Sequence, residues 1–275
     1  MTRTTGSSTW FTTRTTTPRR RGGAGGRSTC STWRRCTTTA PRRRASGGGW
    51  RRWSAVSWNP VTGCLHGCSY CWARRLALTR LKRHPHYALH GFNPAFNERA
   101  LARRFKPGEW VFVSDMGDLW GSWVPGGWIE RVLEVVRANP RTEFFFLTKN
   151  PARYFEFLDR MPENATLGAT VETNRDEGYE RISRAPKPSE RLEAMAELDW
   201  PRKVIVVEPV LDFDLEEFAE AVKRVGPAEV YIGYDNYGCK LPEPPLAKVK
   251  ALISRLEGLT RVHAKSLRPA WYENP

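Results

Sequence analysis

Short hydrophobic stretches alternate with amphipathic ones from about residue 53 to the end of the chain. The hydrophobic stretches are rich in β-branched and aromatic residues, are bounded by turn residues and are apolar on both faces. This pattern is typical of buried parallel strands. It predicts strands over residues 55–58, 110–114, 143–148, 165–171, 203–208 and 229–233, and a weaker one over 261–264.

The segments between these strands carry helix start and stop signals. The signals are Asn139-Pro140 ending a helix over 128–138, Ser189 capping a helix through Leu198, an Asp214/Glu217 capping box, and Gly226 as a helix end. About seven strand–helix units predict an α/β fold with a parallel (β/α) barrel, partly or fully closed. In such folds the chemistry collects at the carboxyl ends of the strands.

The positive charge of the 275-residue chain, formally +15, is concentrated at its N-terminus. Residues 1–53 hold 13 arginines and no acidic residue, and the remainder holds 31 basic and 29 acidic residues. Residues 1–52 are built mainly from Thr, Arg, Gly and Ser, which predicts a disordered basic tail, followed by one domain over 53–275. The tail is either an arm that contacts nucleic acid or an extension without a role, such as upstream sequence read from too early a start codon.

Hydrophobicity along the chain predicts a cytoplasmic protein with no membrane partner. No apolar run approaches the roughly 18 residues of a membrane span, and no hydrophobic signal core lies near the N-terminus. In such a compartment cysteines stay reduced, and the clustered Cys64, Cys68 and Cys71 are odd in number, so a disulfide among these three is not expected. Cys30 and Cys36 lie in the tail, and we assign them no role.

Three cysteines, Cys64, Cys68 and Cys71, form a C-x3-C-x2-C loop after the first strand and before a predicted helix over 72–83. Three close thiolates suit a soft metal centre, and the spacing favours iron–sulfur ligation with one coordination position left open. Zinc is the alternative and requires a fourth ligand, for which His66 and Cys239 are candidates.

The cysteine loop, with the aromatic Tyr70 before its third cysteine, resembles the cluster loop of the radical S-adenosylmethionine superfamily. Segments over 58–64, 111–118, 146–151, 167–172 and 207–209 make the chain most similar to phage-associated radical-SAM-like proteins, and the resemblance covers about residues 54–268. It implies a 4Fe–4S cluster on the three cysteines, with S-adenosylmethionine bound at the fourth iron. An electron donor such as a flavodoxin or ferredoxin would reduce the cluster, which then cleaves the cofactor to methionine and a 5′-deoxyadenosyl radical.

The resemblance also implies cofactor-binding residues at the strand ends, in addition to Tyr70. These are Ser114, Asp115 and Asp118 for the methionine amino group, Thr148 and Lys149 for its carboxylate, Glu172 and Glu208 for the ribose, and Gly233 beside the adenine. The superfamily's Gly-Gly-Glu stretch is missing after the second strand. Each residue has a structural alternative: a carboxylate capping a turn, a lysine in solvent, salt bridges to Arg175 or Lys203, or a turn glycine.

Cys239 follows the sixth strand, at the rim where the cysteine loop is expected. It is a candidate hydrogen-atom donor to a substrate radical, and the alternative is a small buried residue. The histidines His84, His86, His90 and His263 lack metal spacing and are expected to be surface or hydrogen-bonded groups.

No motif identifies the substrate. Leu147-Thr148-Lys149 is similar to a strand end of relatives resembling spore photoproduct lyase, so nucleic acid is one candidate, although the nearly neutral domain gives it little support. No P-loop, G-x-G-x-x-G or G-x-S-x-G motif occurs. The second hypothesis is a non-enzymatic, zinc-stabilised module that binds nucleic acid.

Overall fold

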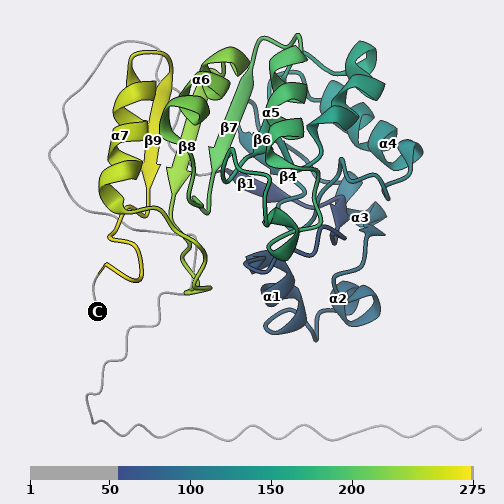
Figure 1. The fold of residues 1–275 in the computed structure, drawn as a ribbon. Coiled ribbons are helices and arrows are strands. Elements are labelled where there is room, and N and C mark those ends of the chain that lie inside the picture. The colour runs from purple at the N-terminus through teal and green to yellow at the C-terminus, as the bar shows by residue number, and fades with distance from the viewer. Residues whose placement is uncertain (1–54, 274–275) are drawn as a thin grey trace, which may run out of the picture. The chain divides into compact units, whose positions relative to one another are not determined.

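The computed structural model describes residues 55–273, which contain a seven-stranded parallel sheet (Figure 1). Its order is β1(Val56–Trp58)-β4(Trp110–Val113)-β5(Glu143–Thr148)-β6(Ala165–Thr170)-β7(Lys203–Val207)-β8(Glu229–Gly233)-β9(Arg261–Lys265). Neighbours in the sheet are thus consecutive long strands of the chain, and β1 and β9 form its two edges. The sheet curls into a half-barrel, which confirms the predicted parallel α/β fold in its partly closed form. All seven predicted strands are present.

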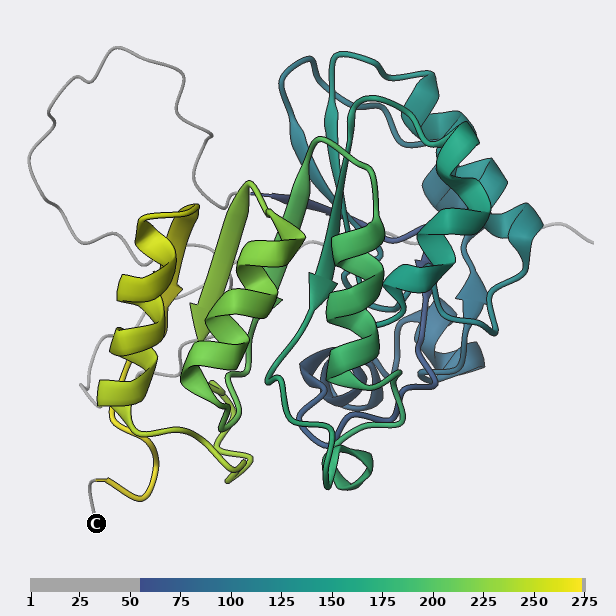
Figure 2. The ribbon, with the colours of Figure 1, turned by 45° about the horizontal axis from the view of Figure 1, so that its top comes forward.

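One face of the sheet is covered by a row of helices (Figure 2). They are α4 (Gly126–Arg137), the 3-10 helix η1 (Pro151–Arg160), α5 (Pro188–Glu197), α6 (Leu215–Val225) and α7 (Leu246–Glu257). Alternate strand residues such as Phe144, Phe146 and Ile205 pack in the main core on this side. Phe145 and Tyr231 belong to a smaller apolar cluster on the opposite face, because successive side chains of a strand point to opposite sides.

Short elements gather beyond the carboxyl ends of the strands, where α1 and α2 lie in Figure 1. They are the antiparallel pair β2 (Val61–Thr62) and β3 (Ala95–Phe96), the helices α1 (Trp72–Leu78), α2 (Pro85–His90) and α3 (Glu98–Leu101), and the 3-10 turn η2 (Tyr179–Arg181). The helix after the cysteine loop ends at Leu78 rather than at residue 83. Its C-cap Thr79 leaves helical geometry, and its hydroxyl donates to the Arg75 carbonyl.

Tertiary contacts change the N-terminal capping of two predicted helices. Helix α5 begins at Pro188 with Lys187 as N-cap, and the Ser189 hydroxyl donates to Asp176 instead of capping. Asp214 is the N-cap of α6, but its carboxylate pairs with Arg175, so the predicted capping box is absent. Gly226 ends α6 in the left-handed region, as predicted.

No helix within residues 55–273 has the length and apolar character needed to cross a membrane. The predicted tail, with Cys30 and Cys36, lies outside the described residues.

Candidate functional site

The cysteine loop connects β2 to α1 and depends on two glycines. Gly63 has a φ of +79°, and a Cβ added there would lie 2.1 Å from the backbone oxygen of Asn93. Gly67 has a φ of +65°, and its added Cβ would lie 3.1 Å from the guanidinium of Arg184. Both positions therefore favour glycine, and at Gly63 the neighbouring backbone leaves no room for another side chain.

Each thiol of the loop has a polar neighbour. Cys64 Sγ accepts from the His66 amide at 3.4 Å, Cys71 Sγ accepts from the Arg74 amide at 3.3 Å, and Cys68 Sγ lies 3.1 Å from the Ser183 hydroxyl. Burial raises the pKa of the Cys64 thiol and of the Cys71 thiol.

Within residues 55–273, no three His, Cys, Asp or Glu side chains are gathered closely enough to bind a single metal ion. The three thiols therefore do not form a ready-made zinc site. A 4Fe–4S cluster makes a different demand, because each of its cysteines binds a different iron and the sulfurs lie further apart than the ligands of one ion.

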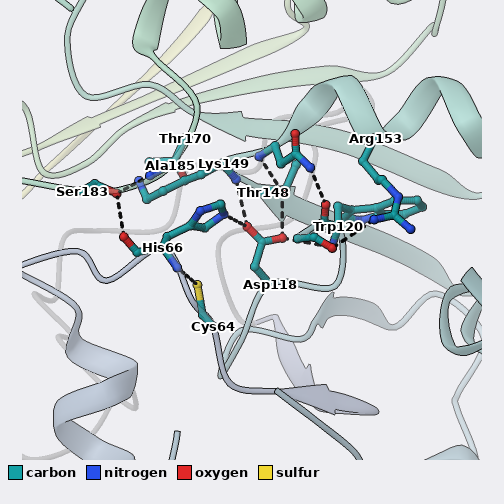
Figure 3. Close-up of polar contacts among 12 residues, drawn as sticks. Cys64, His66, Asp118, Trp120, Thr148, Lys149, Arg153, Thr170, Ser183 and Ala185 are labelled. Carbon is teal, nitrogen blue, oxygen red and sulfur yellow. Dashed lines mark hydrogen bonds and ion pairs between the residues drawn. The ribbon is translucent and has the colours of Figure 1, made fainter. Parts of the chain in front are cut away.

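Asp118 joins the cysteine loop to the end of β5 (Figure 3). Its buried carboxylate lies 3.0 Å from His66 Nε2 and accepts from Thr148 Oγ1 at 2.7 Å, from the Trp120 amide at 3.0 Å and from the Lys149 amide at 3.1 Å. Burial acts to raise the pKa of Asp118, but the hydrogen bonds outweigh it and the pKa lies below its ordinary value. The hydrogen bonds of Asp118, including the one from Thr148, thus fix the cysteine loop against the end of β5.

His66, a candidate fourth zinc ligand, is already engaged in these contacts through its hydrogen bond to Asp118. Its ring is buried, is bound through Nε2 to Asp118, and packs edge-on against Trp123 with ring centroids 4.7 Å apart.

Glu172 collects donors from four parts of the chain at the end of β6. Its fully buried carboxylate accepts hydrogen bonds from Tyr70 and from Lys149, from the Tyr179 hydroxyl at 3.0 Å and from Arg191 Nη1 at 2.8 Å. Burial acts to raise the pKa of Glu172, but the two cations outweigh it and hold the pKa well below its usual range. Tyr70 therefore ties the cysteine loop to the sheet.

From the sequence, Arg175 and Lys203 are the alternative salt-bridge partners of Glu172 and Glu208. Both partners are wrong. Glu172 pairs with Lys149 and Arg191 rather than Arg175, so Lys149 does not project into solvent. Glu208 pairs with Lys265 at 2.6 Å rather than with Lys203. In each case the partner is close in space but distant in the sequence.

Ser114 and Asp115 follow β4. Ser114 has a φ of +55° and is buried, and its hydroxyl has no hydrogen-bond partner within residues 55–273. Asp115 accepts from Ser57 and, at 2.7 Å, from Asn59 Nδ2, and burial raises the pKa of this carboxyl. Ser114 is thus the strand-end residue with an unused polar atom.

Gly233 and Cys239 flank the loop after β8. A Cβ on Gly233 would lie 2.9 Å from the Lys265 carbonyl, so close strand packing already requires glycine there. Cys239 packs with Tyr70 against one small apolar cluster, which places it near the cysteine loop. Burial and, to a lesser degree, Asp235 raise the pKa of its thiol.

Of the four histidines expected to be surface or hydrogen-bonded groups, His84 is exposed. His86 hydrogen-bonds to Thr62 at 2.7 Å, and His90 lies against the His86 ring. His263 is partly buried and stacks on Tyr231. Its Nε2 lies 3.2 Å from Glu229 but makes no hydrogen bond within residues 55–273, so the prediction is wrong for this residue.

Arg191, Tyr179 and Ser183 belong to the site but were not predicted. They lie on or before α5, away from the strand ends on which the sequence argument relied. Arg191 interrupts the buried side of α5, between Pro188 and Leu192, and this is the one signal in the sequence that pointed to a buried charge. A pocket of about 420 Å³ beside the loop is lined by His66, Trp123 and Lys187, among others.

Residues 51–216 match the family model described as "Protein of unknown function (DUF5131)". The chain belongs to this family. No curated protein matches it. The phage-associated group is not identified by these comparisons and stays a prediction.

Solved structures of spore photoproduct lyase share the fold. A cysteine-to-serine mutant has a TM-score of 0.56 at 13% identity, covering 81% of each chain, and a cysteine-to-alanine mutant has 0.54 at 12%, covering 74% of this chain and 75% of that one. The structure of a double mutant with bound AdoMet and dinucleoside spore photoproduct has a TM-score of 0.49 at 14% identity. The present chain spans 61% of the length of that lyase chain.

Proposed function

We propose that this protein is a radical S-adenosylmethionine enzyme with one 4Fe–4S cluster. The observation that carries the proposal is a C-x3-C-x2-C loop at the carboxyl end of a parallel half-barrel sheet. The fold shared with spore photoproduct lyase, a radical SAM enzyme, supports it.

The residues of the loop suit such a cluster. Cys64, Cys68 and Cys71 would be its ligands, and the amides of His66 and Arg74 already donate to two of the sulfurs. Hydrogen bonds of this kind tune the potential of an iron–sulfur centre. When bound, the cluster supplies the single electron that cleaves the sulfonium of S-adenosylmethionine, and a flavodoxin or ferredoxin would be the source of that electron.

The strand ends offer the groups that an amino acid and a ribose require. Lys149 and Arg191 outnumber Glu172 in their buried cluster, which leaves a net positive charge suited to the methionine carboxylate. The unused hydroxyl of Ser114 can bind the amino group. The proposed cofactor site also includes Tyr70, Asp115, Asp118, Thr148, Glu208 and Gly233. Of these, Asp118 and Thr148 would act indirectly, by holding His66 and Lys149 in position through their hydrogen bonds.

Cys239 would keep a hydrogen on Sγ for transfer to a substrate radical. Its raised pKa keeps the thiol protonated at neutral pH, as such a donor requires. In that transfer the S–H bond breaks, a substrate C–H bond forms, and the unpaired electron passes to the sulfur.

Anaerobic reconstitution with iron and sulfide tests the proposal. We expect a broad brown absorbance and, after reduction, formation of 5′-deoxyadenosine from S-adenosylmethionine. Cys68→Ala should abolish both, whereas Ser69→Ala, which changes an exposed neighbour in the same loop, should leave both intact. Cleavage that survives in Cys68→Ala, or zinc without iron in protein purified anaerobically, would instead favour the zinc-stabilised binding module.

A further inference from the structure

The excess of basic over acidic residues in the folded domain is concentrated next to the cysteine loop. Residues 54–97 contain five basic residues and no acidic one, whereas residues 98–275 contain 26 basic and 29 acidic residues. The five are Arg74, Arg75, Arg80, Lys82 and Arg83, on α1 and the turn after it, and all are exposed. Within residues 55–273 none of them forms an ion pair with a carboxylate. The near neutrality of the domain as a whole therefore hides a cationic surface.

Three large aromatic rings are exposed on the loop after β8 and the segment after β9. The exposed fraction is 42% for Tyr237, 48% for Trp271 and 46% for Tyr272. Trp271 Nε1 donates to the Leu241 carbonyl, and the Tyr272 hydroxyl donates to the Glu243 carbonyl, so the polar ends of these rings are fixed. Such a group of exposed rings indicates a binding surface.

The loop that carries Tyr237 is fixed by hydrogen bonds to the buried Asp235. The buried Asp235 accepts from the amides of Tyr237 at 3.1 Å and Cys239 at 2.6 Å, and Arg268 donates to the Asp235 carbonyl. A ring presented by a fixed loop loses little entropy when a ligand stacks on it.

The cations and the rings are interleaved. The Arg75 guanidinium lies 5.8 Å from the centre of the Tyr237 ring, and Lys240 Nζ lies 5.9 Å from the centre of the Trp271 ring. Because α1 begins directly after Cys71, this surface adjoins the proposed cluster, and Figure 1 shows α1 and the loop after β8 both extending beyond the carboxyl end of the sheet. The carboxylate of Glu273 is also nearby but accepts from the amides of Leu246 and Ala270.

We propose that this basic–aromatic rim, formed by Arg75, Arg80, Tyr237, Lys240 and Trp271, binds single-stranded nucleic acid and presents it to the site. Phosphates would pair with the cations, and unpaired bases would stack on the rings, which is how strands are held without reading their sequence. A duplex would hide the base faces. The inference rests on the proposed function only in making the strand a substrate, since binding itself requires no cofactor.

Salt dependence of binding tests the cationic part. The affinity of the full-length protein for a short fluorescent oligothymidylate is measured by anisotropy over a range of salt concentrations. Arg75→Gln/Arg80→Gln should weaken binding several-fold at low salt and reduce the log–log salt slope by about 1.4, at about 0.7 for each phosphate contact. The control Arg224→Gln/Lys250→Gln, which removes two exposed charges on α6 and α7, should change neither.

The tail must be kept out of this comparison, because its arginines also attract nucleic acid. A second full-length series therefore carries glutamine in place of every arginine in residues 1–53. The effect of Arg75→Gln/Arg80→Gln should persist in that series. Its loss there would assign the binding to the tail and overturn the proposal.

Aromatic substitutions test the stacking part. Tyr237→Ala and Trp271→Ala should each weaken binding about tenfold while leaving the salt slope unchanged, and Tyr237→Phe, which keeps the ring, should bind as the unmodified protein does. If all rim variants bind oligothymidylate normally but lose affinity for a reduced flavodoxin, the rim is a docking surface for an acidic protein and the proposal fails. Cleavage of S-adenosylmethionine without oligonucleotide reports on the proposed function separately.

Discussion

At the scale of single residues, Glu172 shows how a carboxylate at a strand end organises the site. Its two oxygens satisfy Lys149 and Arg191 together with two tyrosines, one of which belongs to the cysteine loop. Removing one partner of a buried ion pair leaves the other charge uncompensated in a medium of low polarity, and this costs about 3–5 kcal/mol.

Glu172→Gln should therefore lower the free energy of unfolding by about 3 kcal/mol or more, because it keeps the shape but leaves two buried cations without their anion. Tyr70→Phe, which removes one hydrogen bond, should cost about 1 kcal/mol. The matched control is Glu197→Gln, at an exposed position on α5 without an ion pair among the described residues. Urea unfolding measures all three variants. Equal midpoints for Glu172→Gln and the control would show that the ion pairs of Glu172 add no stability.

The sequence predicted that Lys149 and Glu172 would lie at one edge, because parallel strands end there together. It did not predict that they would bind each other, and it named Arg175 as a partner because that residue is near in sequence. Arg175 instead pairs with Asp212 and Asp214. Arg191 was missed because its place on the apolar side of α5 does not by itself reveal its buried partner, Glu172, which lies on another segment of the chain.

At the scale of elements, strands were predicted better than the ends of helices. A buried strand is recognised by its own apolar run, whereas a cap is decided by competing partners. Ser189 and Asp214 are both good N-cap residues, yet each makes its polar contact elsewhere, to Asp176 and Arg175 respectively. Gly226 was predicted correctly because its left-handed geometry is a property of the residue itself.

The cysteine loop is an element whose shape depends on Gly63. Gly63→Ala should destabilise the protein by about 1–3 kcal/mol through its positive φ alone, and the contact with the Asn93 oxygen adds to that cost. The cluster content after reconstitution should fall as well. Gly127→Ala is the matched control, since its added Cβ meets nothing within 4 Å and alanine favours the first turn of α4. Thermal unfolding and iron analysis measure both variants, and equal iron in the two would show that the loop tolerates a side chain.

At the scale of the whole molecule, the order of the strands followed from the sequence more readily than the closure of the barrel. Repeated strand–helix units with short connections place consecutive strands side by side, and the sheet has that order. Whether β1 pairs with β9 to close the barrel depends on how strongly the whole sheet curls. That property is not encoded in any single segment of the sequence. The nearly neutral domain charge counted from the sequence is correct, but a sum over 222 residues does not show that the excess of basic residues lies within residues 54–97, around α1.

The last prediction concerns the N-terminal segment. Residues 1–49 contain few apolar side chains, so they can bury little surface to offset the entropy of ordering. Their deletion should leave the urea midpoint, the cluster content and the cleavage of S-adenosylmethionine unchanged, while the salt slope for oligothymidylate becomes less steep. Replacing the arginines of residues 1–53 with glutamine in the full-length chain is the control, because it removes the charge and keeps the length. The two proteins should bind alike if charge alone acts. If the truncated protein loses its cluster or precipitates whereas the glutamine variant does not, the segment contributes to the fold and the domain begins before residue 53.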